Sequence, residues 1–308
     1  MQRHVAQMNP FYLLNLSIIW GLIVLFIVQP MIAHKGAEIG ALLFINNLLP
    51  YLLPYIILTQ WLLKSTSGHS RSHTLHYVKA YVLGAFGGFP VGAVTLVEMT
   101  KRQELSVKES SLLLGICHAP GPMFILGFVG LELFQNTALG WKLLLAIHLV
   151  NGCFFLFILF KLKASQTVIH QTTTNHSKRT SSYPLLDALK ESAHVLLLVA
   201  TTVIFFSSLG IVLTATIAKM FTVDTGITET IILSFFEMTA GMSSAFTHLQ
   251  QLPLFPYIIA AILTANGFSI HMQVFAIAKT AHLSLKPYLF FRLSSIVLVP
   301  IVFFLIAH

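Results

Sequence analysis

The chain has 308 residues, of which 56% are hydrophobic and 9% are charged, and its mean hydropathy is +0.82. In soluble domains roughly a quarter of all residues are charged, so this composition excludes an ordinary soluble enzyme. The net charge of +8 comes from Lys and Arg between apolar runs, where membrane proteins carry their topology charges, and we expect no nucleic-acid partner. Both cysteines lie in apolar segments and predict no disulfide. The sequence therefore predicts an all-α polytopic protein embedded in a lipid bilayer.

Five uninterrupted apolar segments are long enough to cross a hydrocarbon layer of about 30 Å. The first, residues 11–32, is followed by no small-residue cleavage site and predicts an uncleaved anchor. The other four are residues 38–63, 140–160, 188–218 and 287–306.

Four further apolar segments are interrupted by Gly, Pro or small polar residues. The interruptions are GGFPVGA (87–93) within 77–100, CHAPGP (117–122) within 109–135, TAGMSSA (239–245) within 228–248, and ANGFSI (265–270) within 254–281. Lipid cannot bond the freed backbone groups, so such breaks require surrounding protein or a water-filled cavity. Paired breaks in two halves of a chain are typical of transporters built from inverted repeats.

The basic residues indicate which segments cross. If 77–100 and 228–248 are re-entrant hairpins, 15 Lys and Arg, Arg292 among them, fall in the loops of one side. Only Lys35, Lys142 and Lys219 fall on the other side. The positive-inside rule places the larger set in the cytoplasm. We therefore predict about seven crossings and two hairpins, with a cytoplasmic N-terminus and an external C-terminus.

This topology predicts four parts of the chain. They are an N-terminal anchor helix (1–36), a first repeat (37–160), a cytoplasmic linker (161–184) and an inverted second repeat (185–308). The linker is basic and rich in Ser and Thr, with no core-forming pattern. Each repeat crosses three times, so the second must be inverted relative to the first.

Taken in order, the interrupted segments resemble a known family. GGFPVGA with the following TKRQELSVKE, then CHAPGPMFILGFVG, FFEMTAGM and ANGFSIHMQV, are similar to the YlbJ-type sporulation integral membrane proteins, from about residue 40 to the C-terminus. That group belongs to the nucleoside-recognition Gate proteins, which are similar to concentrative nucleoside transporters. The resemblance implies a solute carrier of the cell membrane that passes dipicolinic acid, in a spore-former at the outer forespore membrane. The chain departs from the family in its length, which is shorter, and at GGFP, where the family is expected to have Ser-Gly-Tyr-Pro.

The first hairpin and the first broken span carry candidate solute-binding residues. A helix that restarts within the membrane exposes N–H groups whose partial positive charge suits a carboxylate. The glycines at these breaks allow the backbone to approach a solute closely, or else they form a kink that serves helix packing. Phe89 could stack on a heteroaromatic ring, or else it packs in the core. His118 could bind the solute or carry a proton, or be a satisfied core histidine. The residues are Gly87, Gly88, Phe89, Pro90, His118, Pro120 and Gly121.

The second hairpin and the second broken span add a carboxylate. A charge within the membrane costs roughly 3 kcal/mol even on the mildest scale, so Glu237 predicts a coupling site; the alternative is a solvated glutamate at the hairpin mouth. Asn266 and Ser269 offer oxygen atoms to a sodium ion or a polar solute, or else cap a helix. The candidate solute-binding residues are Thr239, Gly241, Asn266, Gly267 and Ser269.

These residues indicate transport rather than catalysis. The sequence has no HExxH, G-x-S-x-G, Walker A or Cys–His metal motif, and we read His69, His73 and His76 as a solvated basic loop. We expect a secondary carrier or facilitator for a small anionic or heteroaromatic solute, with H⁺ coupling at Glu237 or His118, or else Na⁺ coupling, and no other cofactor. A nucleoside is the alternative solute, and a non-transporting scaffold of sporulation is the alternative function. Assembly into a homo-oligomer stays open.

Overall fold

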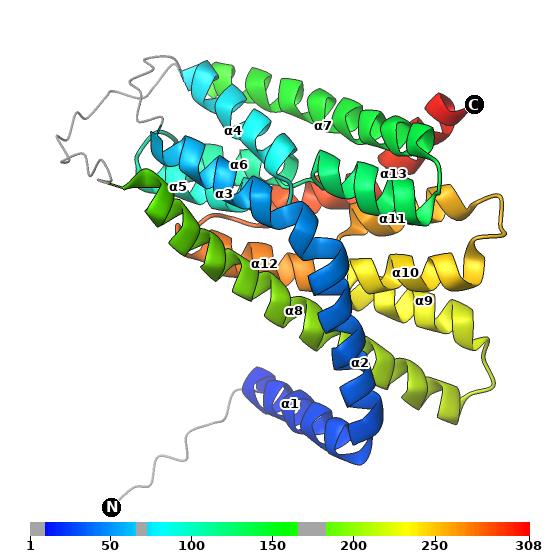
Figure 1. The fold of residues 1–308 in the computed structure, drawn as a ribbon. Helices are drawn as coiled ribbons and strands as arrows, with labels where there is room; N and C mark the ends of the chain where they lie inside the picture. Colours follow the sequence, from blue (N-terminus) through cyan, green and yellow to red (C-terminus); the bar gives the residue numbers. More distant parts are fainter. Residues whose placement is uncertain (1–9, 66–72, 166–182) are drawn as a thin grey trace, which may run out of the picture.

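The structure is a computed structural model that describes residues 10–65, 73–165 and 183–308. These residues form helices and no strand (Figure 1). Six helical segments among them are long and apolar enough to cross a membrane, which confirms the prediction of an all-α polytopic membrane protein. In chain order the helices are α1 (Pro10–Val28), α2 (Pro30–Leu42), the π-helix η1 (Leu43–Leu48), α3 (Leu49–Ser65), α4 (His73–Gly87), α5 (Val91–Lys101), α6 (Val107–Cys117), the π-helix η2 (Phe124–Leu133), α7 (Thr137–Ser165), α8 (Pro184–Met220), α9 (Thr225–Phe236), α10 (Met238–Leu249), α11 (Phe255–Ala265), α12 (Gly267–Lys279) and α13 (Lys286–Ala307).

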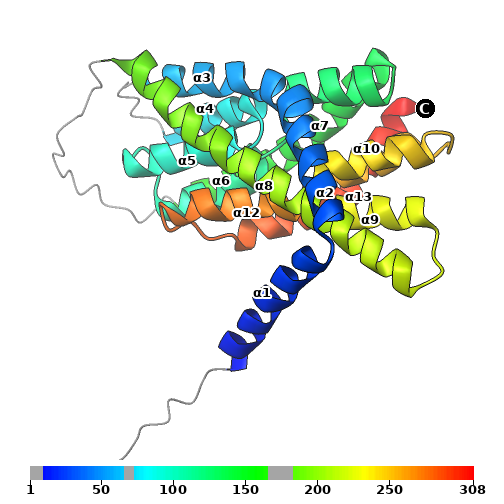
Figure 2. The ribbon, with the colours of Figure 1, turned by 60° about the horizontal axis from the view of Figure 1, so that its bottom comes forward.

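The N-terminal part differs from the prediction in where its first helix ends. Helix α1 projects away from the bundle (Figure 2) and stops at Val28, and α2 begins at Pro30, a residue suited to the first turn because it needs no N–H partner there. Helices α2, η1 and α3 then continue as one helical segment from Pro30 to Ser65. The predicted loop around Lys35 therefore does not exist, and the boundary between residues 36 and 37 falls inside α2.

Both predicted hairpins are pairs of helices packed side by side, α4 with α5 and α9 with α10. Figures 1 and 2 show that the two hairpins enter the bundle from opposite ends. The first is broken after Gly87, as predicted. The second is broken at Glu237, and residues 239–245 are helical, which corrects the predicted break there. Glu237 has extended backbone (φ −142°, ψ 112°), and its own carboxylate caps the helix that follows.

Both broken spans restart after a short irregular stretch. Residues 118–121 separate α6 from the helical turn that leads into η2. Asn266 alone, with a left-handed φ of 74°, separates α11 from α12. After each broken span comes a long unbroken helix, α7 and α13, and α13 packs against both α7 and α11. The element order span, hairpin, broken span, span thus occurs twice along the chain.

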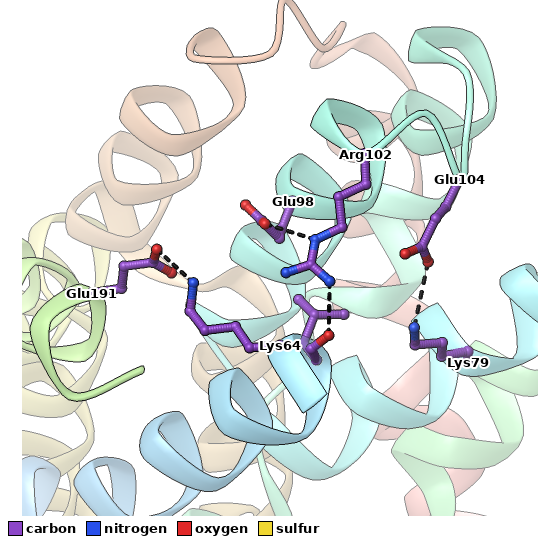
Figure 3. A network of polar contacts seen from close by, with 7 residues as sticks. Lys64, Lys79, Glu98, Arg102, Glu104 and Glu191 are labelled. Atoms are coloured by element: carbon purple, nitrogen blue, oxygen red, sulfur yellow. Dashed lines mark hydrogen bonds and ion pairs between the residues drawn. The ribbon is translucent and has the colours of Figure 1, made fainter. Parts of the chain in front are cut away.

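One end of the bundle gathers polar and charged contacts (Figure 3). Lys64 at the end of α3 pairs with Glu191 of α8 at 2.7 Å, and Lys79 of α4 pairs with Glu104 at 3.4 Å. Arg102 pairs with Glu98 at 2.8 Å and also donates from Nη1 to the Leu63 carbonyl oxygen at 2.8 Å. These contacts join the ends of α3, α4, α5 and α8 at the end where the sequence predicts the cytoplasm.

The structure differs from the sequence predictions at Arg292 and in the linker. The charge count treats Arg292 as a loop residue, but Arg292 lies within α13 and is buried, bonded to groups of α6 and α7. The predicted linker 161–184 is shorter at both ends, since α7 continues to Ser165 and α8 begins at Pro184. Residues 166–182 lie outside the described residues.

Candidate functional site

The tip of the first hairpin lies directly on the break of the first broken span. Gly88 has a φ of 70°, and a Cβ there would lie 2.6 Å from the Gly121 amide nitrogen. A Cβ on Gly84 would lie 2.8 Å from the Cys117 side chain. The structure thus brings the predicted residues Gly87, Gly88, Phe89 and Pro90 together with His118, Pro120 and Gly121.

The second hairpin meets the second broken span in the same way. Gly267 has a φ of 63°, and a Cβ there would lie 2.9 Å from the Met238 amide nitrogen. Gly241 packs against its own hairpin, since a Cβ there would lie 2.5 Å from the Ser234 amide nitrogen. Gly241 therefore serves close packing of α9 on α10, and the solute-binding role predicted for it has no geometric support.

Glu237 lies buried where these two elements meet. Its side chain Oε2 accepts a hydrogen bond from the Ala240 amide at 2.7 Å, and Ser269 Oγ lies 3.5 Å from Oε1. The residue is 1% exposed, so it is not a solvated glutamate at a hairpin mouth. No Lys or Arg in the described part of the chain forms an ion pair with it. The carboxylate thus occupies the N-terminus of the half-helix α10, a position that favours negative charge.

A small cavity of about 20 Å³ lies beside this carboxylate. Its polar lining consists of Glu237, Thr239 and Gln273, and Phe89 from the first hairpin also lines it. The apolar lining comes from Leu48, Leu52, Val199, Val203, Met238 and Ile270. A water molecule fits this volume, whereas an aromatic solute does not. A solute larger than water could therefore occupy this position only if the lining residues move apart.

A second polar group lies around Tyr288 of α13. The Tyr288 hydroxyl is 2.8 Å from His271 Nδ1, and Asn266 Nδ2 donates to it at 3.4 Å. The His118 ring lies 5.8 Å from the Tyr288 ring and 5.3 Å from the Phe89 ring, centroid to centroid. His118 therefore connects the cavity-lining Phe89 with α13.

Sequence reasoning missed Tyr288 and Arg292 as members of this group. The signal that could have found them is their spacing of four residues in an otherwise apolar helix, which puts both on one face. Phe268, at the second break, is 42% exposed, and its ring contacts Phe206 and Phe235.

The histidines near the start of α4 contact carboxylates. His73 Nδ1 lies 4.0 Å from Glu109, and His76 Nδ1 lies 3.6 Å from Glu104. His69 lies outside the described residues. Within the described ranges no group of three or more His, Cys, Asp or Glu could hold a metal ion.

Comparison with known proteins supports the resemblance seen in the interrupted segments. The chain is 25% identical over 309 residues to the sporulation integral membrane protein YlbJ of Bacillus subtilis (strain 168), and the alignment covers 86% of this chain and 75% of that protein. No protein-family model and no solved structure matches the chain. In its long apolar helices, in the order of its interrupted segments and over this alignment, the chain is similar to the sporulation integral membrane protein YlbJ.

Proposed function

We propose that the protein is a carrier that moves a small anionic heteroaromatic solute across the membrane unchanged, with dipicolinate as the first candidate. The observation that carries this proposal is the buried Glu237 carboxylate at the N-terminus of α10, at the edge of the cavity that the two hairpin tips enclose. Interrupted helices that meet around such a carboxylate are the arrangement with which secondary carriers bind solute and coupling ion.

Glu237 supplies the coupling step in this mechanism. The Ala240 amide that now binds its carboxylate is the donor that a solute carboxylate would use. Two carboxylates side by side in a low-dielectric site repel each other, so binding of the anion requires Glu237 to take up a proton. Release of that proton on the other side of the membrane expels the solute. The solute and one proton therefore cross together.

The aromatic part of the solute finds its partner in Phe89. Phe89 and Glu237 line the same cavity, so a flat ring bound beside Glu237 would have the Phe89 ring within reach for stacking. The sporulation name of the relative supports dipicolinate, a pyridine dicarboxylate made in spore-formers, over a nucleoside.

The test is uptake of radiolabelled dipicolinate into proteoliposomes that contain the full chain. We expect saturable uptake driven by an inward proton gradient and unchanged by a sodium gradient. Glu237→Gln should lose gradient-driven accumulation at least about tenfold while it keeps solute exchange, because the neutral glutamine side chain does not repel the anionic solute but cannot take up a proton.

Glu132→Gln is the matched control. Glu132 also lies in an apolar helix, η2, but it is exposed, bonded to Asn47 and Tyr51, and does not line the cavity, so uptake should stay at the wild-type level. If neither the wild type nor the variants take up dipicolinate or uridine, the carrier function is rejected and the scaffold function remains. Sodium-driven uptake that survives in Glu237→Gln would reject the coupling role of Glu237.

A further inference from the structure

Arg292 is a buried cation without a counter-charge. It is 2% exposed, and its Nη2 donates to the Gly115 carbonyl oxygen at 2.6 Å and to Asn151 Oδ1 at 3.4 Å. Both acceptors are neutral, and its Nε has no hydrogen-bond partner. None of the ion pairs among the described residues includes Arg292. A guanidinium within a membrane protein pairs with an anion or with backbone carbonyl groups. Here the acceptors of Arg292 among the described residues are two neutral oxygen atoms, which leave its Nε without a hydrogen-bond acceptor.

The groups around Arg292 are also short of partners. Both ring nitrogens of His118 are buried and unbonded, and so is Oδ1 of Asn266. His118 is 0% exposed and packs edge-on against Tyr288, one helical turn before Arg292 on α13. Unbonded buried polar atoms are rare and costly, and several in one place indicate a site that binds a polar ligand.

This group is connected to the cavity. The His118 ring contacts Phe89, which lines the cavity, on one side and Tyr288 on the other. A rotation of the Phe89 ring away from His118 would therefore open the cavity toward His118, which packs on Tyr288, one turn before Arg292 on α13.

We propose that Arg292, with His118 beside it, binds a carboxylate of the transported solute. This inference rests on the proposed function and names the positive charge that an anion carrier needs, while Glu237 handles the proton at the other tip. A planar dicarboxylate suits the arrangement, because the guanidinium can bind one carboxylate through two parallel N–H groups while the ring stacks on Phe89 or His118.

A purely structural role would leave part of the geometry unexplained. Arg292 bonds the Gly115 carbonyl in the last turn of α6, as a helix cap would. A capping role explains the bond from Arg292 to the Gly115 carbonyl, but it leaves Nε of Arg292 without a hydrogen-bond acceptor. A cap also needs no positive charge, since a neutral donor would serve. The two roles predict different selectivity, which gives the test its readout.

The experiment measures binding to the purified full chain by titration calorimetry. The probes are dipicolinate, benzoate and the neutral pyridine-2,6-dicarboxamide, which has the shape of dipicolinate without its charge. We expect Arg292→Gln to weaken dipicolinate and benzoate binding about 10- to 100-fold and to leave dicarboxamide binding unchanged. Arg292→Lys, which keeps the charge but loses the two-pronged geometry, should fall between wild type and Arg292→Gln.

The control variant is Arg102→Gln, because Arg102 already pairs with Glu98 at the end of the bundle, and it should bind all three probes as wild type does. Equal loss of all three probes in Arg292→Gln, or no loss, would overturn the inference and leave the carrier in place. Carboxylate binding that depends on Arg292 but without any uptake would overturn the carrier and keep the site. If wild type binds none of the carboxylates, both are wrong.

Discussion

The contact between the first hairpin and the first broken span predicts what one added methyl group would do at Gly92. A Cβ there would lie 2.6 Å from the Cys117 carbonyl carbon and 3.2 Å from the His118 amide nitrogen. Both atoms belong to the backbone, so α5 must move away from α6 to make room. Overpacking of this kind destabilises the closed tip by about 1–3 kcal/mol, which raises the ratio of opened to closed tip about 5- to 150-fold.

Cys117 reports that opening, because it is buried beneath the tip, whereas the other cysteine, Cys153, is exposed. In a Cys153→Ser background, a neutral maleimide should label Cys117 about 5 to 150 times faster in Gly92→Ala than in its parent. Gly21→Ala is the control: its Cβ meets nothing within 4 Å, and the labelling rate should not change. A rate in Gly92→Ala equal to that of the parent, in correctly folded protein, would refute the claim that the tip rests on the break.

Two further predictions concern the polar end of the bundle. Ser106→Ala should lower the free energy of unfolding in detergent by about 1 kcal/mol, because the Ser106 hydroxyl accepts from the Glu109 amide in the capping box of α6; an unchanged denaturation midpoint would contradict this. Lys64→Ala should cost less than about 1 kcal/mol, since its partner Glu191 is partly exposed, and the difference from wild type should vanish in concentrated salt. A difference that persists in salt would mean that packing of the lysine stem, rather than charge, is lost.

The sequence allowed three of the four breaks to be predicted, because each of those breaks contains residues that cannot continue a helix. Gly88 requires a positive φ, and Pro120 and Pro122 end α6 and open the helix after the break. Asn266 and Gly267 both have a positive φ. The remaining break, in the second hairpin, is predicted at residues 239–245 because Gly241 suggests a helix breaker. This prediction is too late in the chain, since Gly241 is helical. The residue that ends α9 is Glu237, whose capping bond to Ala240 has no such signature in the sequence.

The position of Arg292 could not be predicted by counting charges. A count of loop charges treats each arginine in the same way, and Arg292 lies only six residues after the start of α13. What buries it is its bond to Gly115, 177 residues earlier in the chain, together with Asn151. Contacts of that range depend on the packing of α13 against α6 and α7, which no local pattern encodes. The same holds for the presence of Phe89 and Glu237 in the lining of one cavity.

The glycine contacts at the tips have a mechanical consequence. Backbone touches backbone where Gly88 meets Gly121 and where Gly267 meets Met238, so each hairpin is fastened to the broken span beside it. Phe89 of the first tip and Thr239 of the second both line the cavity, and none of the tip glycines contacts the opposite tip. The cavity can therefore widen by a relative shift of the two tips while each hairpin keeps its backbone contact with its own broken span. Such a shift would change the distance between Glu237 and His118 without unwinding a helix.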